Sequence, residues 1–278
     1  ARAKERGIPV FSYIPPSAWA WRKGRAKSCA ALADEIVAIF PHELPPYEAA
    51  GANISFVGNP LIDTVHAEMG EEAARNHFGI GAGDIPILLM PGSRREEIER
   101  LLPPMLGAAE LLAAEDSTRR FFLPVAGGVD VAQIEQHLAN SSVTVTLTHD
   151  ARYALMGIAR AAIAASGTVI MEAAIMGLPA VVLYRMSALS YLVGRLLVDV
   201  PRFSLPNILL GETFETELLQ DAVQPERIAA AMEKIIADGA ERDYVTERLA
   251  CAVVMLGEPH AARRVAEKIL ALGKHRDY

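Results

Sequence analysis

Short apolar runs alternate with amphipathic stretches along most of the chain, and this alternation predicts strands separated by helices. Eight runs are predicted to form strands: Ile8–Ile14, Glu35–Phe40, Ile54–Val57, Ile85–Met90, Arg119–Val125, Val143–Leu147, Ala161–Ala165 and Pro179–Tyr184. Most of them are continuously apolar, as is typical of strands that helices cover on both faces. Short connections between strands and helices indicate right-handed βαβ units, so the predicted fold class is α/β with a doubly wound parallel sheet.

Helical spacing of apolar residues is clearest in two stretches. In Arg94–Glu115 apolar residues recur every three or four positions, although Pro103 and Pro104 are expected to kink or split the helix. Residues 225–238 repeat the spacing behind a proline at a tolerated position. Beyond residue 240 the pattern becomes purely helical, and two more helices are predicted over 241–256 and 259–272.

A domain boundary is predicted near Gly58-Asn59-Pro60. Too few strands precede it for a complete domain, whereas five strands with their helices follow it, enough for a Rossmann-like domain. The expected organisation is a remnant of one Rossmann-like domain over residues 1–60, a complete one over 61–240 and terminal helices over 241–278. The chain opens at Ala1–Arg6 as if inside an element, which predicts a fragment with upstream sequence missing.

Composition narrows the class of protein. Apolar residues make up 51% of the 278 residues and charged residues 22%, a balance that excludes a disordered chain. The net charge of −7 argues against a general nucleic-acid-binding protein. Two cysteines are too few for a disulfide framework and indicate a reducing cytosol, and the seven histidines show no metal-ligand spacing. No apolar run approaches the roughly 20 residues that span a bilayer.

The first candidate motif, Pro91-Gly92-Ser93-Arg94, joins a buried strand to an amphipathic helix. Gly92 permits a tight turn with close backbone approach, and Ser93 is predicted to be the N-cap. Free amides at a helix start attract anions, and Arg94 adds a forked donor that suits phosphate oxygens. An ordinary capped turn with a surface arginine explains the same residues, and chemistry alone leaves both interpretations open.

The second candidate motif, Ser166-Gly167-Thr168, also ends a buried strand and opens a helix, with Glu172 one turn further on. The hydroxyls and the glycine amide could contact a nucleotide, and a carboxylate suits the two hydroxyls of a ribose. A simple capping arrangement is the alternative. Two such turns at carboxyl ends of parallel strands are stronger than one, because nucleotides bind at that edge of open α/β sheets.

Two weaker candidates lie outside these bends. Asn207, in Ser204-Leu205-Pro206-Asn207, can donate and accept hydrogen bonds, which suits a sugar or a phosphate. Trp19 and Trp21 stand among prolines and would form either core packing or an aromatic wall beside a sugar or acyl chain.

These motifs occur in a fixed order along the chain, and the ordered set resembles the lipid-A-disaccharide synthase family. The resemblance covers nearly the whole chain and rests on Ile14–Arg22, Gly58–Asp63, Pro91–Arg94 with Glu97 and Ile98, Ser166–Thr168 with Glu172, Tyr184-Arg185 and Ser204–Leu209.

The resemblance implies a hexosyltransferase of GT-B architecture that needs no cofactor and no metal. Such an enzyme transfers 2,3-diacylglucosamine from UDP-2,3-diacylglucosamine to 2,3-diacylglucosamine 1-phosphate, which forms the β(1→6) disaccharide of lipid A in Gram-negative bacteria and releases UDP. It would be cytoplasmic, in peripheral contact with the inner membrane, and would bind no nucleic acid. The helices of 241–278 would pack back on the N-terminal domain and exchange between the protomers of a homodimer.

The resemblance also assigns roles to residues. Gly92, Ser93 and Arg94 would contact the diphosphate, and Arg94 and Asn207 would be required for catalysis. The nucleotide contacts would be Ser166, Gly167, Thr168 and Glu172, with Glu172 at the ribose. Asn207 would contact the donor sugar or a phosphate, and Trp19 and Trp21 match the family's aromatic motif.

Two departures from the family pattern stand out. The family's N-terminal portion, with the aspartate expected to be the general base, has no counterpart here, so the chain alone is expected to be inactive. Gly211-Glu212-Thr213 replaces a Gly-Arg-Glu sequence and reverses a charge. The alternatives are another GT-B enzyme that uses UDP-N-acetylglucosamine, such as a peptidoglycan transferase or a UDP-sugar 2-epimerase, or a UDP-binding module without activity.

Overall fold

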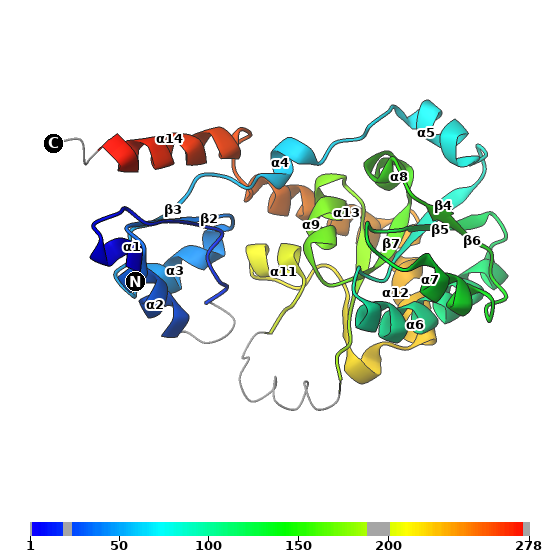
Figure 1. Ribbon diagram of the computed structural model, residues 1–278. Helices are drawn as coiled ribbons and strands as arrows, with labels where there is room; N and C mark the ends of the chain where they lie inside the picture. The colour runs from blue at the N-terminus through cyan, green and yellow to red at the C-terminus, as the bar shows by residue number, and fades with distance from the viewer. Residues whose placement is uncertain (1, 19–23, 188–200, 275–278) are drawn as a thin grey trace. The chain divides into compact units, whose positions relative to one another are not determined.

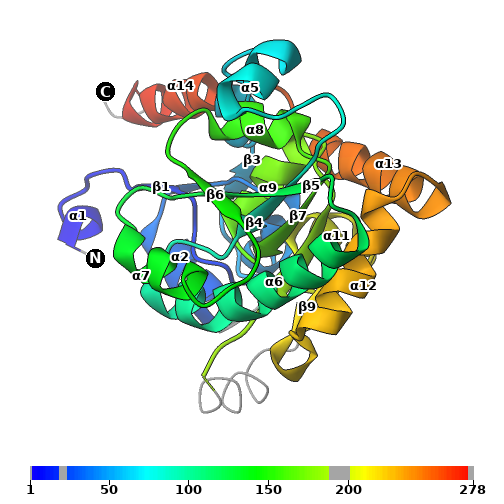
Figure 2. The same ribbon diagram turned by 90° about the vertical axis from the view of Figure 1, so that its right-hand side faces the viewer.

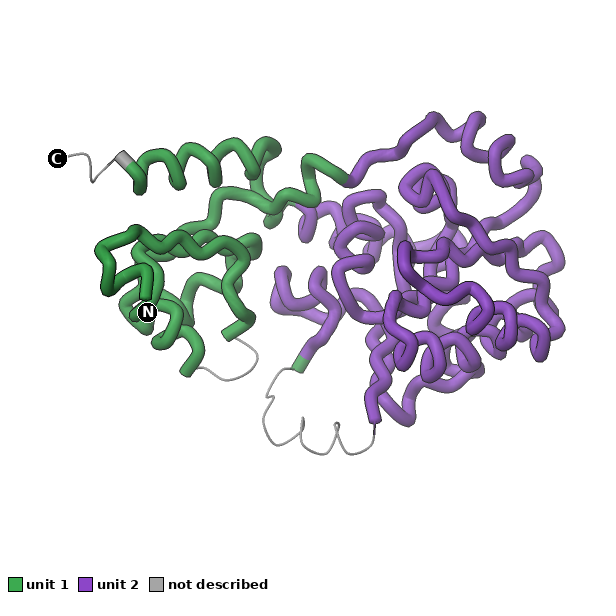
Figure 3. Tube along the Cα trace, viewed as in Figure 1, with its two compact units in different colours: residues 1–64, 189–201, 254–278 green, residues 65–188, 202–253 purple. Residues whose placement is uncertain are grey.

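The structure, a computed structural model, describes residues 2–18, 24–187 and 201–274, which form two compact units (Figure 3). Unit 1 contains the described residues of 1–64, 189–201 and 254–278, and unit 2 those of 65–188 and 202–253. Each unit is built around its own parallel sheet, which confirms the predicted α/β class. Trp19 and Trp21 lie outside the described residues.

Unit 2 contains a six-stranded sheet in which every pair of neighbouring strands is parallel (Figure 1). Its strands are β4 (Ile85–Met90), β5 (Arg119–Pro124), β6 (Val145–Thr148), β7 (Ala161–Ala165), β8 (Ala180–Tyr184) and β9 (Glu217–Leu219). The order across the sheet is β6-β5-β4-β7-β8-β9, which is 3-2-1-4-5-6 when counted from β4. The winding therefore reverses between β4 and β7, and ligands of such sheets bind at the carboxyl ends of the strands at this point.

Helices cover both faces of this sheet (Figure 2). They are α5 (Glu71–Phe78), α6 (Arg95–Glu115), α7 (Val131–Leu138), α8 (Arg152–Ile158), α9 (Thr168–Ile175), α11 (Leu205–Leu210), α12 (Pro225–Ile236) and α13 (Ala240–Val254). Alternate residues of the central strands point to opposite faces, and both sets are buried. Leu88 and Ala164, for example, belong to the core cluster that also contains residues of α8 and α9. Burial of both faces explains why these strands are continuous apolar runs.

Of the two outcomes predicted for Pro103 and Pro104, a kink or a split, the structure excludes the split, because both prolines lie inside the single helix α6. A proline in a helix interior removes a hydrogen bond and costs about 3 kcal/mol. The neighbouring side chains Leu101, Leu102 and Met105 are at most 2% exposed. Helix α6 also packs against helix α12 in unit 2. Burial of about 2 kcal/mol per large apolar side chain offsets the proline penalty over a helix of this length.

Unit 1 has a three-stranded parallel sheet in the order β1-β2-β3. Its elements are α1 (Arg2–Glu5), β1 (Phe11–Tyr13), α2 (Gly24–Leu32), β2 (Glu35–Ala38), α3 (Leu44–Glu48), β3 (Ile54–Phe56), α4 (Leu61–Thr64) and α14 (Ala261–Lys274), with a short 3-10 helix before α3. The core contains Ile36 and Tyr47, and the buried Tyr47 hydroxyl donates to the Pro16 carbonyl over 2.7 Å.

Helix α14 joins unit 1 although some 200 residues separate it from the sheet (Figure 1). Arg264 Nε donates to the Val57 carbonyl over 2.7 Å, and Lys268 Nζ lies 2.6 Å from Glu35 Oε1. The Asp63 carboxylate accepts from the amides of His260 and Ala261 at the start of the helix. No described helix combines the length and the apolar composition needed to cross a bilayer.

The structure divides the chain differently from the sequence. The first division, after Thr64, lies close to the boundary predicted near residue 60, whereas the second falls between Val253 and Val254 and not at residue 240, so the two terminal helices belong to different units. Helix α13 stays in unit 2 because Arg242 on it donates to the Arg160 and Ile235 carbonyls and because Leu249 is fully buried. Helix α14 alone packs with the N-terminal residues.

All eight predicted strands are present, most of them shorter at the ends than their apolar runs. The ninth strand, β9, was not predicted. Its three residues contain a glutamate and are only partly buried at the edge of the sheet, so they leave no apolar run to recognise. The four long helices predicted by spacing are α6, α12, α13 and α14.

Candidate nucleotide site

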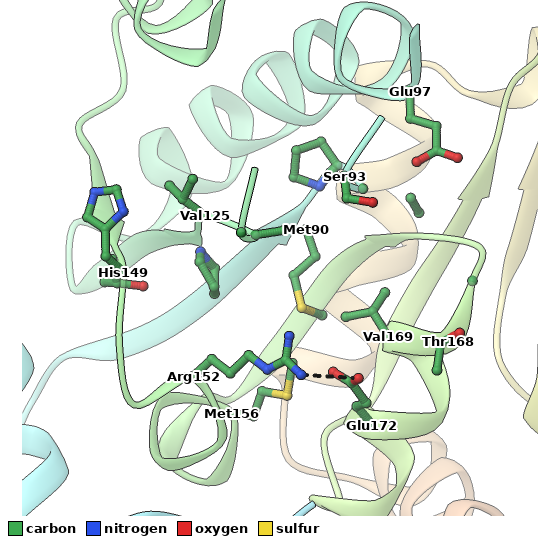
Figure 4. Close-up of a pocket in the computed structure, with 18 of the residues that line it drawn as sticks. Met90, Ser93, Glu97, Val125, His149, Arg152, Met156, Thr168, Val169 and Glu172 are labelled. Atoms are coloured by element: carbon green, nitrogen blue, oxygen red, sulfur yellow. Dashed lines mark hydrogen bonds and ion pairs between the residues drawn. The ribbon is translucent and has the colours of Figure 1, made fainter. Parts of the chain in front are cut away.

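A cavity of about 600 Å³ lies at the carboxyl ends of β4, β5, β6 and β7, at the switch point of the unit 2 sheet (Figure 4). Both glycine-bearing bends predicted from the sequence line it, together with the loops that follow β5 and β6. Seven of the eight residues expected to bind the nucleotide sugar are among its walls: Gly92, Ser93, Arg94, Ser166, Gly167, Thr168 and Glu172. The topology brings them together because β4 and β7 are hydrogen-bonded neighbours.

The bend after β4 depends on Gly92, whose φ of +100° L side chains rarely adopt. A Cβ at this position would overlap the Glu97 carboxylate. That carboxylate accepts from the Arg94 amide over 3.4 Å and pairs with Arg94 Nη1 at 2.8 Å. The N-cap of α6 is therefore Arg94, which corrects the prediction that Ser93 caps the helix. Ser93 is left exposed at the cavity wall.

Two hydrogen bonds made by Ser166 hold the bend after β7 in place. Its amide donates to the Leu183 carbonyl over 2.8 Å, and its hydroxyl donates to the Phe203 carbonyl over 2.9 Å. Gly167 follows in extended backbone, and no atom comes within 4 Å of the place where its Cβ would stand. Helix α9 begins at Thr168, so its first amides lie beside this open space with no intrahelical acceptor.

Glu172 extends from the first turn and a half of α9 toward the cavity (Figure 4). Glu172 is only 8% exposed. Oε1 lies 3.3 Å from Arg152 Nη2, whereas Oε2 is buried with no hydrogen-bond partner among the described residues. Burial raises the pKa of this carboxyl, and the positive charge of Arg152 opposes that rise. A buried acceptor without a donor is costly, so a ligand hydroxyl at this point would be stabilising.

Two wall residues were not identified from the sequence. The Thr148 hydroxyl, at the end of β6, is buried and has no hydrogen-bond partner among the described residues. Arg152 opens α8 and lines the cavity with its half-exposed guanidinium. The available signal was their place directly after the predicted strand Val143–Leu147, the same rule that identified the other two bends.

Asn207 lies apart from the other predicted site residues, because it is not among the residues that line the cavity and is fully buried. Its Nδ2 donates to the Glu215 carbonyl over 3.0 Å and to Glu217 Oε1 over 2.7 Å. Its Oδ1 accepts from the amides of Phe214 and Glu215, both at 3.0 Å. The side chain thus joins the start of α11 to the segment that leads into β9, and its donors and acceptor are already occupied. These four hydrogen bonds give Asn207 a structural role, and its expected contact with a sugar or a phosphate stays a prediction.

The charges around the cavity are mixed. Two arginines, Arg94 and Arg152, each pair with a glutamate of the same wall. The Arg94 side chain is 82% exposed. An exposed ion pair of this kind contributes at most about 1 kcal/mol to stability. Arg94 can therefore leave Glu97 for a stronger anionic partner at little cost. With the amides that open α6 and α9, it gives one side of the cavity the character of an anion site.

Comparison with known proteins agrees with this geometry. The family model described as lipid-A-disaccharide synthetase matches residues 1–271. The lipid-A-disaccharide synthase of Syntrophus aciditrophicus is 41% identical over 276 residues, which cover 99% of this chain and 72% of that protein. The synthase of Geobacter sulfurreducens is 40% identical over 273 residues, with 98% and 71% covered.

Among solved structures, UDP-GlcNAc 2-epimerase from Neisseria meningitidis, bound to UDP-GlcNAc, is similar with a TM-score of 0.66 at 16% identity. The similarity covers 97% of this chain and 71% of the epimerase, and at that identity it shows a shared GT-B fold. The matches to the family model and to the two synthases cover nearly the full chain, the latter at about 40% identity, and they show the family as well as the fold. The chain therefore belongs to the lipid-A-disaccharide synthase family of glycosyltransferases.

Proposed function

We propose that the cavity of unit 2 binds the UDP portion of UDP-2,3-diacylglucosamine. The chain would thereby provide the donor site for transfer of 2,3-diacylglucosamine to 2,3-diacylglucosamine 1-phosphate. The observation that carries the proposal is the buried, unpartnered Oε2 of Glu172 in the same cavity as two glycine-bearing helix starts. A nucleoside diphosphate has the matching groups, hydroxyls on its ribose and an anionic diphosphate.

The ribose fits the Glu172 side of the cavity. A carboxylate oxygen accepts only, and a ribose presents two adjacent hydroxyls that can donate. A hydrogen bond to a charged acceptor contributes about 1.5–3 kcal/mol, which is enough to select a ribose over a sugar without the hydroxyl. The Thr148 hydroxyl on the same wall offers one more unused polar group to the nucleoside.

The diphosphate fits the side that Gly92 and Gly167 open. The amides there do not need to reorganise when charge develops on the leaving diphosphate, and Arg94 adds a mobile positive charge. In the transfer, the 6-hydroxyl oxygen of the acceptor attacks C1 of the donor sugar, and the bond from C1 to the diphosphate oxygen breaks. UDP leaves with the electron pair, and a carboxylate acting as general base receives the hydroxyl proton.

The acyl chains of both substrates support a further proposal, that the protein works in peripheral contact with the inner membrane. Each acyl chain favours a lipid phase over water by about 0.8 kcal/mol per methylene. Substrates of this kind are therefore concentrated at the membrane surface, where the protein must reach them.

Calorimetric titration of the chain with UDP tests the donor site. We expect saturable binding that Glu172→Gln and Arg94→Ala each weaken about tenfold, since each removes one charge-assisted contact. Arg100→Ala is the matched control, because Arg100 lies on the same helix and pairs with Glu96 at 3.3 Å but does not line the cavity. If the control weakens binding as much as Arg94→Ala, or if neither site variant weakens it, the assignment fails.

A further inference from the structure

We propose that Arg152 is a positioning residue of this site, which holds the Glu172 carboxylate as an oriented, charged acceptor for a hydroxyl of the nucleoside. The inference rests on the proposed nucleotide site and deepens it. None of the motifs in the sequence assigns a role to Arg152. Its part would be indirect, because its contact is with Glu172 and not with the nucleotide.

The first observation is that Arg152 engages one carboxylate oxygen and leaves the other for the ligand. Arg152 Nη2 lies 3.3 Å from Glu172 Oε1, and the two side chains point toward one another across the cavity wall (Figure 4). They come from different helices, α8 and α9, which follow β6 and β7. The contact at Oε1 restrains the carboxylate on one side, and Oε2 has no hydrogen-bond partner among the described residues.

The second observation is that Arg152 is itself held in place. Its guanidinium lies 4.6 Å from the centre of the Tyr153 ring, and Nη2 donates to the Tyr153 hydroxyl over 2.6 Å. Glu68 Oε2 accepts from the Ala154 amide over 2.7 Å and so fixes the start of α8. Ala151, directly before Arg152, has a φ of +46°, an unusual conformation for a residue with a side chain.

The third observation is electrostatic. A positive side chain at a helix start is opposed by the helix dipole, so the position of Arg152 requires compensation. Burial lowers the pKa of Arg152, and the hydrogen bond to Tyr153 and the negative charges of Glu172 and Glu68 outweigh burial and raise it. In return, Arg152 lowers the pKa of Glu172, against the rise caused by burial.

The other charged groups near Glu172 do not take over this role. The cavity walls also carry Arg94 and Glu97 on the α6 side, and His149 and Asp150 in the loop after β6. Arg94 pairs with Glu97 and Asp150 with His77, whereas Arg152 is the cation that pairs with the Glu172 carboxylate among the described residues. Helix α11, which packs against α9, and strand β7 carry no titratable side chain. Arg152 is therefore the described residue whose positive charge opposes the rise that burial causes in the pKa of Glu172.

The test is the pH dependence of binding for UDP-N-acetylglucosamine, measured by calorimetric titration from pH 5 to pH 8.5. Both phosphates of this probe are diesters and stay ionised over the range, so an acidic loss of affinity reports the protein. Without Arg152, Glu172 would take up a proton at higher pH and would cease to accept through that oxygen. For Arg152→Met we expect about tenfold weaker binding at pH 5.5, a smaller loss at pH 8, and an acidic limb moved to higher pH.

Two further variants separate positioning from a general structural effect. Arg152→Lys keeps the positive charge and should restore most of the acidic limb. In Glu172→Gln the acidic limb should disappear, and adding Arg152→Met to it should cost less than twofold more, because Arg152 then has no carboxylate to hold.

The outcomes distinguish this inference from the proposed function. If Glu172→Gln weakens binding but Arg152→Met leaves affinity and pH profile unchanged, the positioning role is wrong and the site stands. If Arg152→Met costs the same at every pH, with or without Glu172, Arg152 contacts the nucleotide directly and the inference is also wrong. If the chain binds no UDP-sugar, or Glu172→Gln binds like the unchanged protein, the proposed site falls and this role falls with it.

Discussion

At the scale of single residues, Glu215 shows how burial sets the charge of a carboxyl group in unit 2. It is 1% exposed, and its Oε2 accepts from the Ser204 hydroxyl over 2.7 Å. Its Oε1 is buried without a hydrogen-bond partner among the described residues. Burial raises the pKa of Glu215 to about 8, and the neighbouring Glu217 adds to the rise. At neutral pH the side chain is therefore mainly protonated.

This raised pKa predicts a loss of stability as the pH increases. An unfolded chain releases the Glu215 proton near pH 4.5, whereas the folded protein keeps it up to about pH 8. Between these values the folded state binds the extra proton, so the free energy of unfolding falls with rising pH by up to about 1.4 kcal/mol per unit. Glu215→Gln is neutral at every pH and should remove this part of the slope.

Thermal unfolding from pH 5 to pH 8.5 measures the effect. The melting temperatures of Glu215→Gln and the unchanged protein should be close at pH 5, and the variant should be increasingly more stable toward pH 8. Glu247→Gln, on the exposed face of α13, is the control and should follow the unchanged protein. A constant difference at all pH values would mean that Glu215 does not titrate in this range.

At the scale of elements, the two glycine-bearing bends are alike in sequence and different in what they require. Gly92 is needed by the folded backbone, because its φ is +100° and a Cβ would meet Glu97. Gly167 has extended backbone and open space around it, so none of the described residues demands a glycine there. Its role must come from whatever approaches that space.

Alanine at each bend should therefore produce opposite results. Gly92→Ala should lower the free energy of unfolding by about 1–2 kcal/mol, from backbone strain and displacement of Glu97. Gly167→Ala should change it by less than about 0.5 kcal/mol but weaken UDP binding about tenfold, because the methyl group occupies the space of the diphosphate. Chemical denaturation and calorimetric titration of both variants check this, and a destabilised Gly167→Ala that binds UDP normally would refute it.

The elements also show which parts of the fold and of the site could be predicted from the sequence and which could not. Apolar runs and helical spacing predicted the central strands and the long helices, because burial on both faces leaves a continuous pattern. The residues of the two turns also predicted that both bends face one cavity, and both bends line it. Arg152 and Thr148 follow a predicted strand, but the contact of Arg152 with Glu172 joins two helices and is not recorded by any local pattern. The partners of Asn207 are only seven to ten residues away, in a segment without a recognisable pattern. The three-residue β9 leaves no apolar run to recognise, and packing keeps α6 in one piece at its prolines.

At the scale of the whole chain, the cavity and the chain ends belong to different units. Every residue that lines the cavity lies in unit 2, between Glu68 and Glu172. Unit 1 instead joins the first 64 residues to α14, and polar contacts as well as buried side chains such as Ala261 and Val265 hold the junction together. The Asp63 carboxylate makes two of these polar contacts, because it accepts from the amides of His260 and Ala261, 2.6 and 3.1 Å away.

Removing this carboxylate should loosen unit 1 and leave nucleotide binding intact. Asp63 acts on α14 as an N-cap from a distant part of the chain, and loss of an N-cap costs about 1 kcal/mol. In Asp63→Ala we expect faster amide hydrogen exchange in β3 and α14, unchanged exchange in β4 and β7, and the same affinity for UDP. Asp243→Ala, an exposed substitution on α13, should change neither. A weaker affinity for UDP in Asp63→Ala would contradict this expectation, because the residues that line the cavity all belong to unit 2.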